Sequence, residues 1–117
     1  MVYLFGSKAL NIDSELSDID IAVLLDNKNK YDLRKLLLDL IFDFSQLFHN
    51  DKIDILILNN ASLSIQYNVI CEGKILYQLN DNIKCNYETK IIKLYLDFKK
   101  YEIEYYKIMH QKYLQID

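Results

Sequence analysis

The sequence contains no proline and only two glycines among its 117 residues, and no proline- or glycine-rich linker divides it. We therefore predict one domain over residues 1–117. The net charge of −3 gives no bulk attraction to nucleic acid or anionic lipid. No apolar run approaches the roughly 20 residues of a membrane span, and residues 1–6 lack the basic head of a signal peptide. These absences predict a soluble cytoplasmic protein with no membrane or direct nucleic-acid partner.

Cysteine and histidine are scarce and scattered, which excludes a conventional zinc site. Cys71 and Cys85 have no metal-site spacing, and we interpret both as buried thiols in a reducing cytosol. His49 and His110 are far apart and are expected at the surface. The 51% hydrophobic and 26% charged content is ordinary for a globular protein and excludes a disordered chain.

Hydrophobic periodicity predicts alternating strands and helices. Strands are expected at residues 2–5, 18–25, 53–58 and 74–79. Helices are expected around an apolar stripe that runs from Leu33 to Phe48, and at 62–72 and 87–113. Asn29 is a plausible N-cap for the first of these helices, Ser62 caps the second, and Gly73 ends it at the C′ position. The order predicts an α+β fold: a small mixed β-sheet with helices packed on one face and a long C-terminal helix.

Three sequence features suggest a phosphate and metal site. Gly6 and Ser7 directly follow a strand, where free N–H groups and a hydroxyl can hold phosphate oxygens. Asp18 and Asp20 lie two residues apart, so in a strand both point to one face. Asp54 joins that face if its strand is the neighbour. Three carboxylates on one patch repel unless a cation lies between them, and Mg²⁺ is the default beside phosphate. This chemistry suggests nucleotidyl transfer from a nucleoside triphosphate.

The spacing of these features resembles the signature of the DNA polymerase β-like nucleotidyltransferases in their minimal, stand-alone form. Ten residues separate Gly6-Ser7 from Asp18-Ile19-Asp20. Similar stretches are residues 5–9 (FGSKA), 17–23 (SDIDIAV), 53–61 (IDILILNNA) and 71–77 (CEGKILY). Residues 95–98 (YLDF), which lead into a charged aromatic helix, are similar to the tail of MntA-type antitoxins. The resemblance spans residues 3 to about 110.

The resemblance implies an antitoxin that transfers AMP from ATP to a tyrosine of a HepT-type toxin, a HEPN-domain ribonuclease with which it forms a hetero-oligomer. Gly6 and Ser7 would then bind the triphosphate, and Lys8, where relatives often have Arg, would offer charge to a phosphate. Asp18 and Asp20 would coordinate Mg²⁺. Asp54 would complete the metal site and help deprotonate the attacking hydroxyl, because a tyrosine hydroxyl is a poor nucleophile at neutral pH.

Two alternative functions remain open. One is a non-catalytic antitoxin that neutralises the toxin by tight binding. The other is nucleotidyl transfer to a small molecule, which usually needs a second domain to hold the acceptor. Relatives commonly carry Gly where this chain has Asn11, and a helix ahead of the first strand. A late start codon or a shortened variant would each leave apolar surface exposed, to be covered by a partner or a second copy.

The helix expected at 87–113 interleaves tyrosines with lysines, a pattern that can contact RNA. Acidic residues share the helix, however, so it is close to charge-balanced. Because it is too long to bury fully against so small a sheet, we expect its outer half to dock a protein partner. Gln66 and Tyr67 either line a nucleotide-base pocket or simply pack a short helix.

Overall fold

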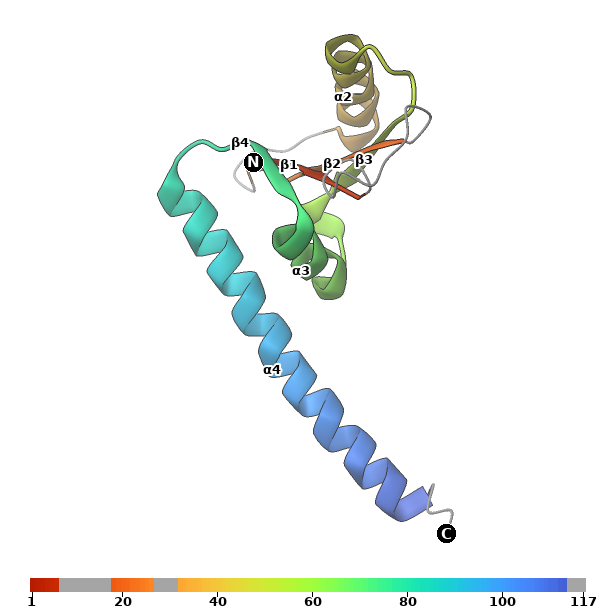
Figure 1. The fold of residues 1–117 in the computed structure, drawn as a ribbon, viewed down its shortest axis with the longest axis vertical. Helices are drawn as coiled ribbons and strands as arrows, with labels where there is room; N and C mark the ends of the chain where they lie inside the picture. Colours follow the sequence, from red (N-terminus) through yellow and green to blue (C-terminus); the bar gives the residue numbers. More distant parts are fainter. Residues whose placement is uncertain (7–17, 27–31, 114–117) are drawn as a thin grey trace.

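The structure is a computed structural model that describes residues 1–6, 18–26 and 32–113 (Figure 1). Its four strands are β1 (Val2–Phe5), β2 (Ile19–Val23), β3 (Ile53–Ile57) and β4 (Lys74–Tyr77), in the order β3-β2-β1-β4. β1 pairs antiparallel with both β2 and β4, whereas β2 and β3 are parallel. The predicted small mixed sheet and the α+β class are confirmed.

Helices cover both faces of the sheet, so the prediction that they pack on one face is wrong. The first face buries Ile19, Ile21, Val23, Ile53 and Ile57, against which helix α2 (Leu33–Phe48) packs. The second face buries Tyr3 and Ala22 with Val69 of helix α3 (Leu63–Glu72) and Leu58 of the short 3₁₀ helix η1 (Leu58–Asn60). Ile21 and Ala22 are both fully buried. Because neighbouring strand residues point to opposite faces, an apolar pair of this kind needs cover on both sides.

Helix ends follow local capping chemistry. α2 begins after Asp32, whose side chain accepts a hydrogen bond from the Lys35 N–H at 3.4 Å, and Asn29 lies outside the described residues. Ser62 caps α3 as predicted, accepting from the Ile65 N–H at 3.3 Å. Gly73 ends α3 in extended backbone (φ −76°) and donates its N–H to the Val69 carbonyl at 2.7 Å. The left-handed conformation typical of a C′ glycine is therefore absent at this position.

The last helix, α4, spans Asp81–Tyr113 and begins six residues before the predicted start. Asn80 explains the difference, because its side chain accepts from the Ile83 N–H at 2.9 Å and caps the helix. Thirty-three residues give a helix about 50 Å long. The radius of gyration is 18.0 Å, against about 13 Å for a compact domain of this length. α4 therefore extends far beyond the rest of the fold (Figure 1).

Two tyrosine hydroxyls fasten the first part of α4 to the fold. Tyr3, on β1, donates to Glu88 Oε1 at 3.0 Å, and Tyr87 donates to Gln66 Oε1 of α3 at 2.7 Å. Burial is the main reason that the pKa of Tyr3 is strongly raised and that of Tyr87 is raised to about 12. Both hydroxyls therefore stay protonated donors at neutral pH. Only Ile91 of α4 is buried, so this anchored segment carries nearly all of the helix's packing.

Considerable apolar surface is exposed on the described part of the chain. No residue of α2 is buried, and a groove of about 490 Å³ runs between α2 and the β1–β4 edge, lined by Val2, Phe44, Leu47, Phe48, Leu76 and Tyr77. His49 and His110 are exposed, as predicted. Cys71 and Cys85 are free and also exposed, so their interpretation as buried thiols is wrong. Within the described part of the chain, no helix combines the length and apolar content needed to cross a membrane.

Candidate functional site

The parallel register of β2 and β3 brings two of the predicted carboxylates together. Asp20 is paired directly with Asp54 across the two strands, so both side chains leave the sheet on the same face. Neighbouring strands lie about 4.8 Å apart, and this spacing sets the distance between the points where the two side chains leave the backbone. Asp20 is half-buried and Asp54 is exposed. The predicted meeting of these two residues is confirmed.

Gly6 lies immediately beside Asp20. Phe5 is paired with Asp20 across the antiparallel β1–β2 ladder, and Gly6 follows with φ +72°, in the left-handed region that favours glycine. A Cβ atom placed on Gly6 would lie 2.3 Å from Asp20 Oδ2. Two constraints therefore favour glycine at this position. The backbone conformation disfavours residues with a side chain, and the Asp20 carboxylate occupies the space that a Cβ atom would need. Ser7 and Lys8, predicted to bind phosphate, lie outside the described residues.

Asp18 precedes β2 and is exposed. The pKa of the Asp20 carboxyl is raised above its ordinary value: burial is the largest cause, followed by the negative charges of Asp54 and then Asp18. Asp20 therefore sits in the field of both other carboxylates. The three residues form one patch of negative charge at the end of β1 and the start of β2 and β3.

The chemistry of this patch suits a hard divalent cation, because carboxylate oxygens are the ligands that Mg²⁺ prefers. In the part of the chain that the structure describes, however, no three Asp, Glu, His or Cys side chains converge closely enough to hold a metal ion as placed. The backbone register fixes where the side chains of Asp20 and Asp54 begin, and rotation about χ1 and χ2 sets where their oxygens point. The donor types thus suit a magnesium ion, whereas the oxygens of the described carboxylates do not converge on one point.

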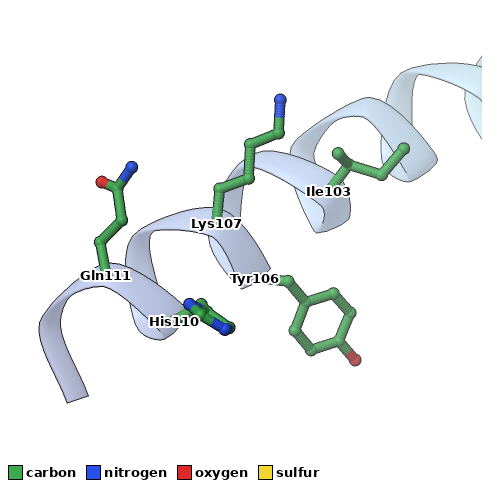
Figure 2. Close-up of a pocket in the computed structure, with 5 residues that line it drawn as sticks. All are labelled: Ile103, Tyr106, Lys107, His110 and Gln111. Carbon is green, nitrogen blue, oxygen red and sulfur yellow. The ribbon is translucent and has the colours of Figure 1, made fainter. Parts of the chain in front are cut away.

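Two hollows on the described part of the surface lie away from this patch. One, about 410 Å³, is a shallow depression on α4 formed by side chains of that helix alone (Figure 2). Another, about 340 Å³, lies among α3, α4 and the far end of β2, and Gln66 lines it. Gln66 also donates to the Ala61 carbonyl at 3.0 Å, while Tyr67 stacks on Tyr95 with ring centroids 3.9 Å apart. Both residues pack α3 against its neighbours, and the hollow that Gln66 lines is at the opposite end of β2 from Asp20.

Comparison with known proteins decides the family. The sequence pattern of the family described as polymerase beta, nucleotidyltransferase, matches residues 1–82. The chain belongs to this family. The match covers the whole sheet, including Gly6, Asp18, Asp20 and Asp54, and it ends at the second residue of α4. No curated protein matches the chain.

Solved structures of toxin–antitoxin systems share the fold of this nucleotidyltransferase. One is a toxin–antitoxin with AMP-PNP, 25% identical, with a TM-score of 0.67 over 92% of this chain and 83% of that one. A second, MntA–HepT, is 23% identical, with a TM-score of 0.63 over 92% and 80%. A third is a tri-AMPylated Shewanella oneidensis HEPN toxin in complex with MNT antitoxin, 22% identical, with a TM-score of 0.64 over 92% and 80%.

Sequence reasoning missed the residues that position α4 relative to the nucleotidyltransferase sheet. Tyr3 lies within the strand predicted over residues 2–5, and its hydroxyl donates to Glu88, 85 residues away. A signal was available, because a tyrosine within a buried strand needs a hydrogen-bond partner. The identity of that partner depends on tertiary packing and could not be read from spacing.

Proposed function

We propose that this nucleotidyltransferase is an antitoxin that transfers AMP from ATP to a tyrosine of a HEPN-type ribonuclease toxin. The observation that carries the proposal is the Asp20–Asp54 pair, placed side by side by the β2–β3 register with the Gly6 backbone against Asp20. This is the arrangement that a triphosphate and its cation need: close backbone approach on one side and carboxylate oxygens on the other.

The structural relatives support both the nucleotide and the acceptor. One similar structure contains AMP-PNP, a non-hydrolysable relative of ATP, and another contains a tri-AMPylated HEPN toxin beside its antitoxin. The shared fold and the family's nucleotidyltransferase chemistry agree with these two complexes. We infer the acceptor class from them.

Each residue of the site has a role in the proposed reaction. The Gly6 backbone approaches the triphosphate, and Ser7 and Lys8 add a hydroxyl and a positive charge to the phosphates. Asp18, Asp20 and Asp54 would hold Mg²⁺, which when bound neutralises charge on the triphosphate and on the leaving pyrophosphate. The raised pKa of Asp20 means that this carboxylate gains from a nearby cation more than an isolated one does.

The transfer step exchanges one phosphorus–oxygen bond for another. The acceptor tyrosine's oxygen attacks the α-phosphorus of ATP, and the bond from that phosphorus to the pyrophosphate oxygen breaks. The hydroxyl proton passes to the Asp54 carboxylate, which is exposed and can accept it as the new bond forms. Pyrophosphate leaves with the electron pair of the broken bond.

Intact mass spectrometry of the partner toxin tests this proposal directly. The toxin is incubated with the chain, ATP and Mg²⁺, and AMP-sized mass steps on the toxin are expected. Asp18→Asn/Asp20→Asn should abolish those steps. Asp39→Asn/Asp43→Asn is the matched control, since it removes the same charge from exposed positions of α2. Circular dichroism verifies that both variants are folded. A wild-type chain that leaves the toxin mass unchanged contradicts the proposal.

A second candidate function is neutralisation by binding alone. It is favoured by the large apolar side chains that α4 exposes beyond the rest of the fold. The same pair of variants separates the two functions. If the Asp18→Asn/Asp20→Asn protein still suppresses the toxin's ribonuclease activity as the control does, occlusion is sufficient. If suppression disappears together with AMP transfer, the transfer is what neutralises the toxin.

A further inference from the structure

The outer half of α4 carries an ordered apolar stripe, which we call the distal seam: Phe98, Tyr101, Tyr105 and Ile108. These residues are spaced by three, four and three positions, the spacing of the a and d positions of a coiled coil. Their exposed fractions are 50%, 70%, 58% and 50%. The helix therefore presents a regular row of large apolar side chains to solvent over about three turns.

The distal seam continues a contact that begins within the fold. Tyr87, Ile91 and Leu94 occupy the preceding positions of the same three-and-four spacing, and all three line the hollow between α3 and α4. α3 has only ten residues, and α4 extends well beyond its end (Figure 1). The row that packs inside the domain in its first part is thus left uncovered in its second part.

Acidic residues flank the distal seam on both sides. With Phe98 and Tyr105 at a, residues Asp97 and Glu104 fall at g and Glu102 falls at e. The lysines of this half, Lys99, Lys100 and Lys107, fall at b and c, facing away from the seam. Glu102 forms an ion pair with Lys99 at 3.4 Å. This contact keeps the Glu102 carboxylate at the edge of the seam, so that it does not cover the apolar side chains. The row ends at Lys112, the next a position.

These charges argue against a second copy of α4 as the occupant. In an antiparallel pair that matches Phe98 with Ile108 and Tyr101 with Tyr105, Glu104 would face its own copy, and so would Glu102. In a parallel pair, Asp97 would face Glu102. Like charges at e and g positions disfavour coiled-coil pairing. The shallow depression on α4 shown in Figure 2 includes Ile103 and His110 at f positions and Tyr106 at a b position, away from the a and d positions of the seam, and leaves this conclusion unchanged.

We propose that the distal seam binds one helix of a protein partner, with an apolar seam of its own flanked by lysine or arginine. Resting on the proposed function, this helix belongs to the toxin. A ribonuclease needs cationic surface to bind its substrate's phosphates, so an acid-flanked apolar helix is a fitting cover for such a surface. The nucleotidyltransferase family match ends at residue 82, which leaves the distal seam outside the part assigned to transfer.

Two designed helical peptides test the proposal with the full chain. Both carry the same apolar a and d residues, and they differ only at e and g, which are all lysine in one and all glutamate in the other. Like charges keep each peptide from pairing with itself. At low salt we expect the lysine peptide to bind about tenfold more tightly, from three ion pairs of ordinary exposed strength, with less advantage at high salt.

Variants of the chain sharpen the result. Asp97→Lys/Glu102→Lys/Glu104→Lys should invert the preference, whereas Lys100→Glu/Lys107→Glu, on the other side of the helix, should preserve it. Tyr101→Ser/Tyr105→Ser should weaken both peptides. Equal binding, a preference for the glutamate peptide, or an unchanged preference in the triple variant overturns the proposal. So does a single-stranded RNA that binds the wild type and is lost with Tyr101→Ser/Tyr105→Ser, or a wild-type dimer that the same variant dissolves.

The peptide assay separates this proposal from the proposed function. Asp18→Asn/Asp20→Asn should bind the lysine peptide as the wild type does, because those residues are in the sheet. If the lysine peptide binds and the toxin gains no AMP, the transfer proposal fails and the seam proposal stands. If the toxin gains AMP and neither peptide binds, the seam proposal fails and the transfer proposal stands.

Discussion

The two glycines of this chain offer a matched test of the site, because a Cβ atom at either one meets a neighbour at nearly the same distance. At Gly6 that neighbour is Asp20 Oδ2, at 2.3 Å, and at Gly73 it is the backbone oxygen of Val69, at 2.4 Å. The first is the end of a rotatable side chain in the candidate site. The second is part of the α3 backbone at its last turn. Replacing each glycine by alanine should therefore affect different properties.

For Gly6→Ala we expect a modest loss of stability and a large loss of transfer. An alanine at φ +72° costs about 1–2 kcal/mol, which lowers the Tm by roughly 5 °C in a domain of this size. The Asp20 carboxylate relieves the overlap by turning away, and a displacement of about 1 Å at a reacting site can cost a hundredfold in rate. We expect a rate loss of about that size.

For Gly73→Ala we expect a similar loss of stability and no loss of transfer per folded molecule. Its φ of −76° suits alanine, but the rigid Val69 carbonyl cannot rotate away, so overpacking costs about 1–3 kcal/mol. Thermal unfolding and toxin mass spectrometry, below both transition temperatures, measure the two properties. The reasoning is refuted if Gly6→Ala transfers AMP at the wild-type rate, or if Gly73→Ala loses as much activity as Gly6→Ala.

Three further predictions concern single side chains. Asp54→Asn should lower the pKa of Asp20, since it removes a neighbouring negative charge, and a carboxyl NMR titration that finds no change would contradict the proposed patch. Tyr3→Phe should cost about 1–2 kcal/mol in chemical denaturation by leaving Glu88 without its 3.0 Å donor. The raised pKa of Tyr3 adds stability that is present below pH of about 10 and lost as pH rises further, so this variant should also lose less stability on alkaline titration than the wild type. Ser62→Ala should cost about 1 kcal/mol by removing the α3 cap, measured in the same way, and unchanged stability would show that the cap is replaced by water.

The meeting of Asp20 and Asp54 was predictable because it depends on strand geometry. The alternation of Asp18 and Asp20 with apolar residues indicated one face, and the apolar run around Asp54 indicated a further strand. Which strands are neighbours was the assumption, and the parallel β2–β3 pairing confirms it. The spacing could not reveal that Gly6 and Asp20 press together, because that contact depends on the antiparallel register of β1.

The errors of sequence reasoning have physical causes of the same kind. The start of α4 was placed six residues late because Asn80 is a cap only if the preceding strand ends at Tyr77. The one-face arrangement failed because Ala22, a small residue, is as fully buried as Ile21 on the opposite side. Burial of cysteine was assumed from its average behaviour, whereas Cys71 and Cys85 lie on helix positions that face water.

Because α4 is continuous, it fixes the distance between the candidate site and the distal seam. It is one uninterrupted helix, fastened near its start by Tyr3 to Glu88 and by Tyr87 to Gln66, so the reach from the Asp20–Asp54 pair to the distal seam is fixed. A partner bound to that seam can bring to the carboxylates only those of its groups that lie at this fixed distance and direction from the seam. In the proposed reaction, the position of the acceptor relative to the carboxylates would then select it. Each residue added to the helix between anchor and seam would advance the seam by about 1.5 Å and turn it by about 100°, and so choose a different acceptor or none.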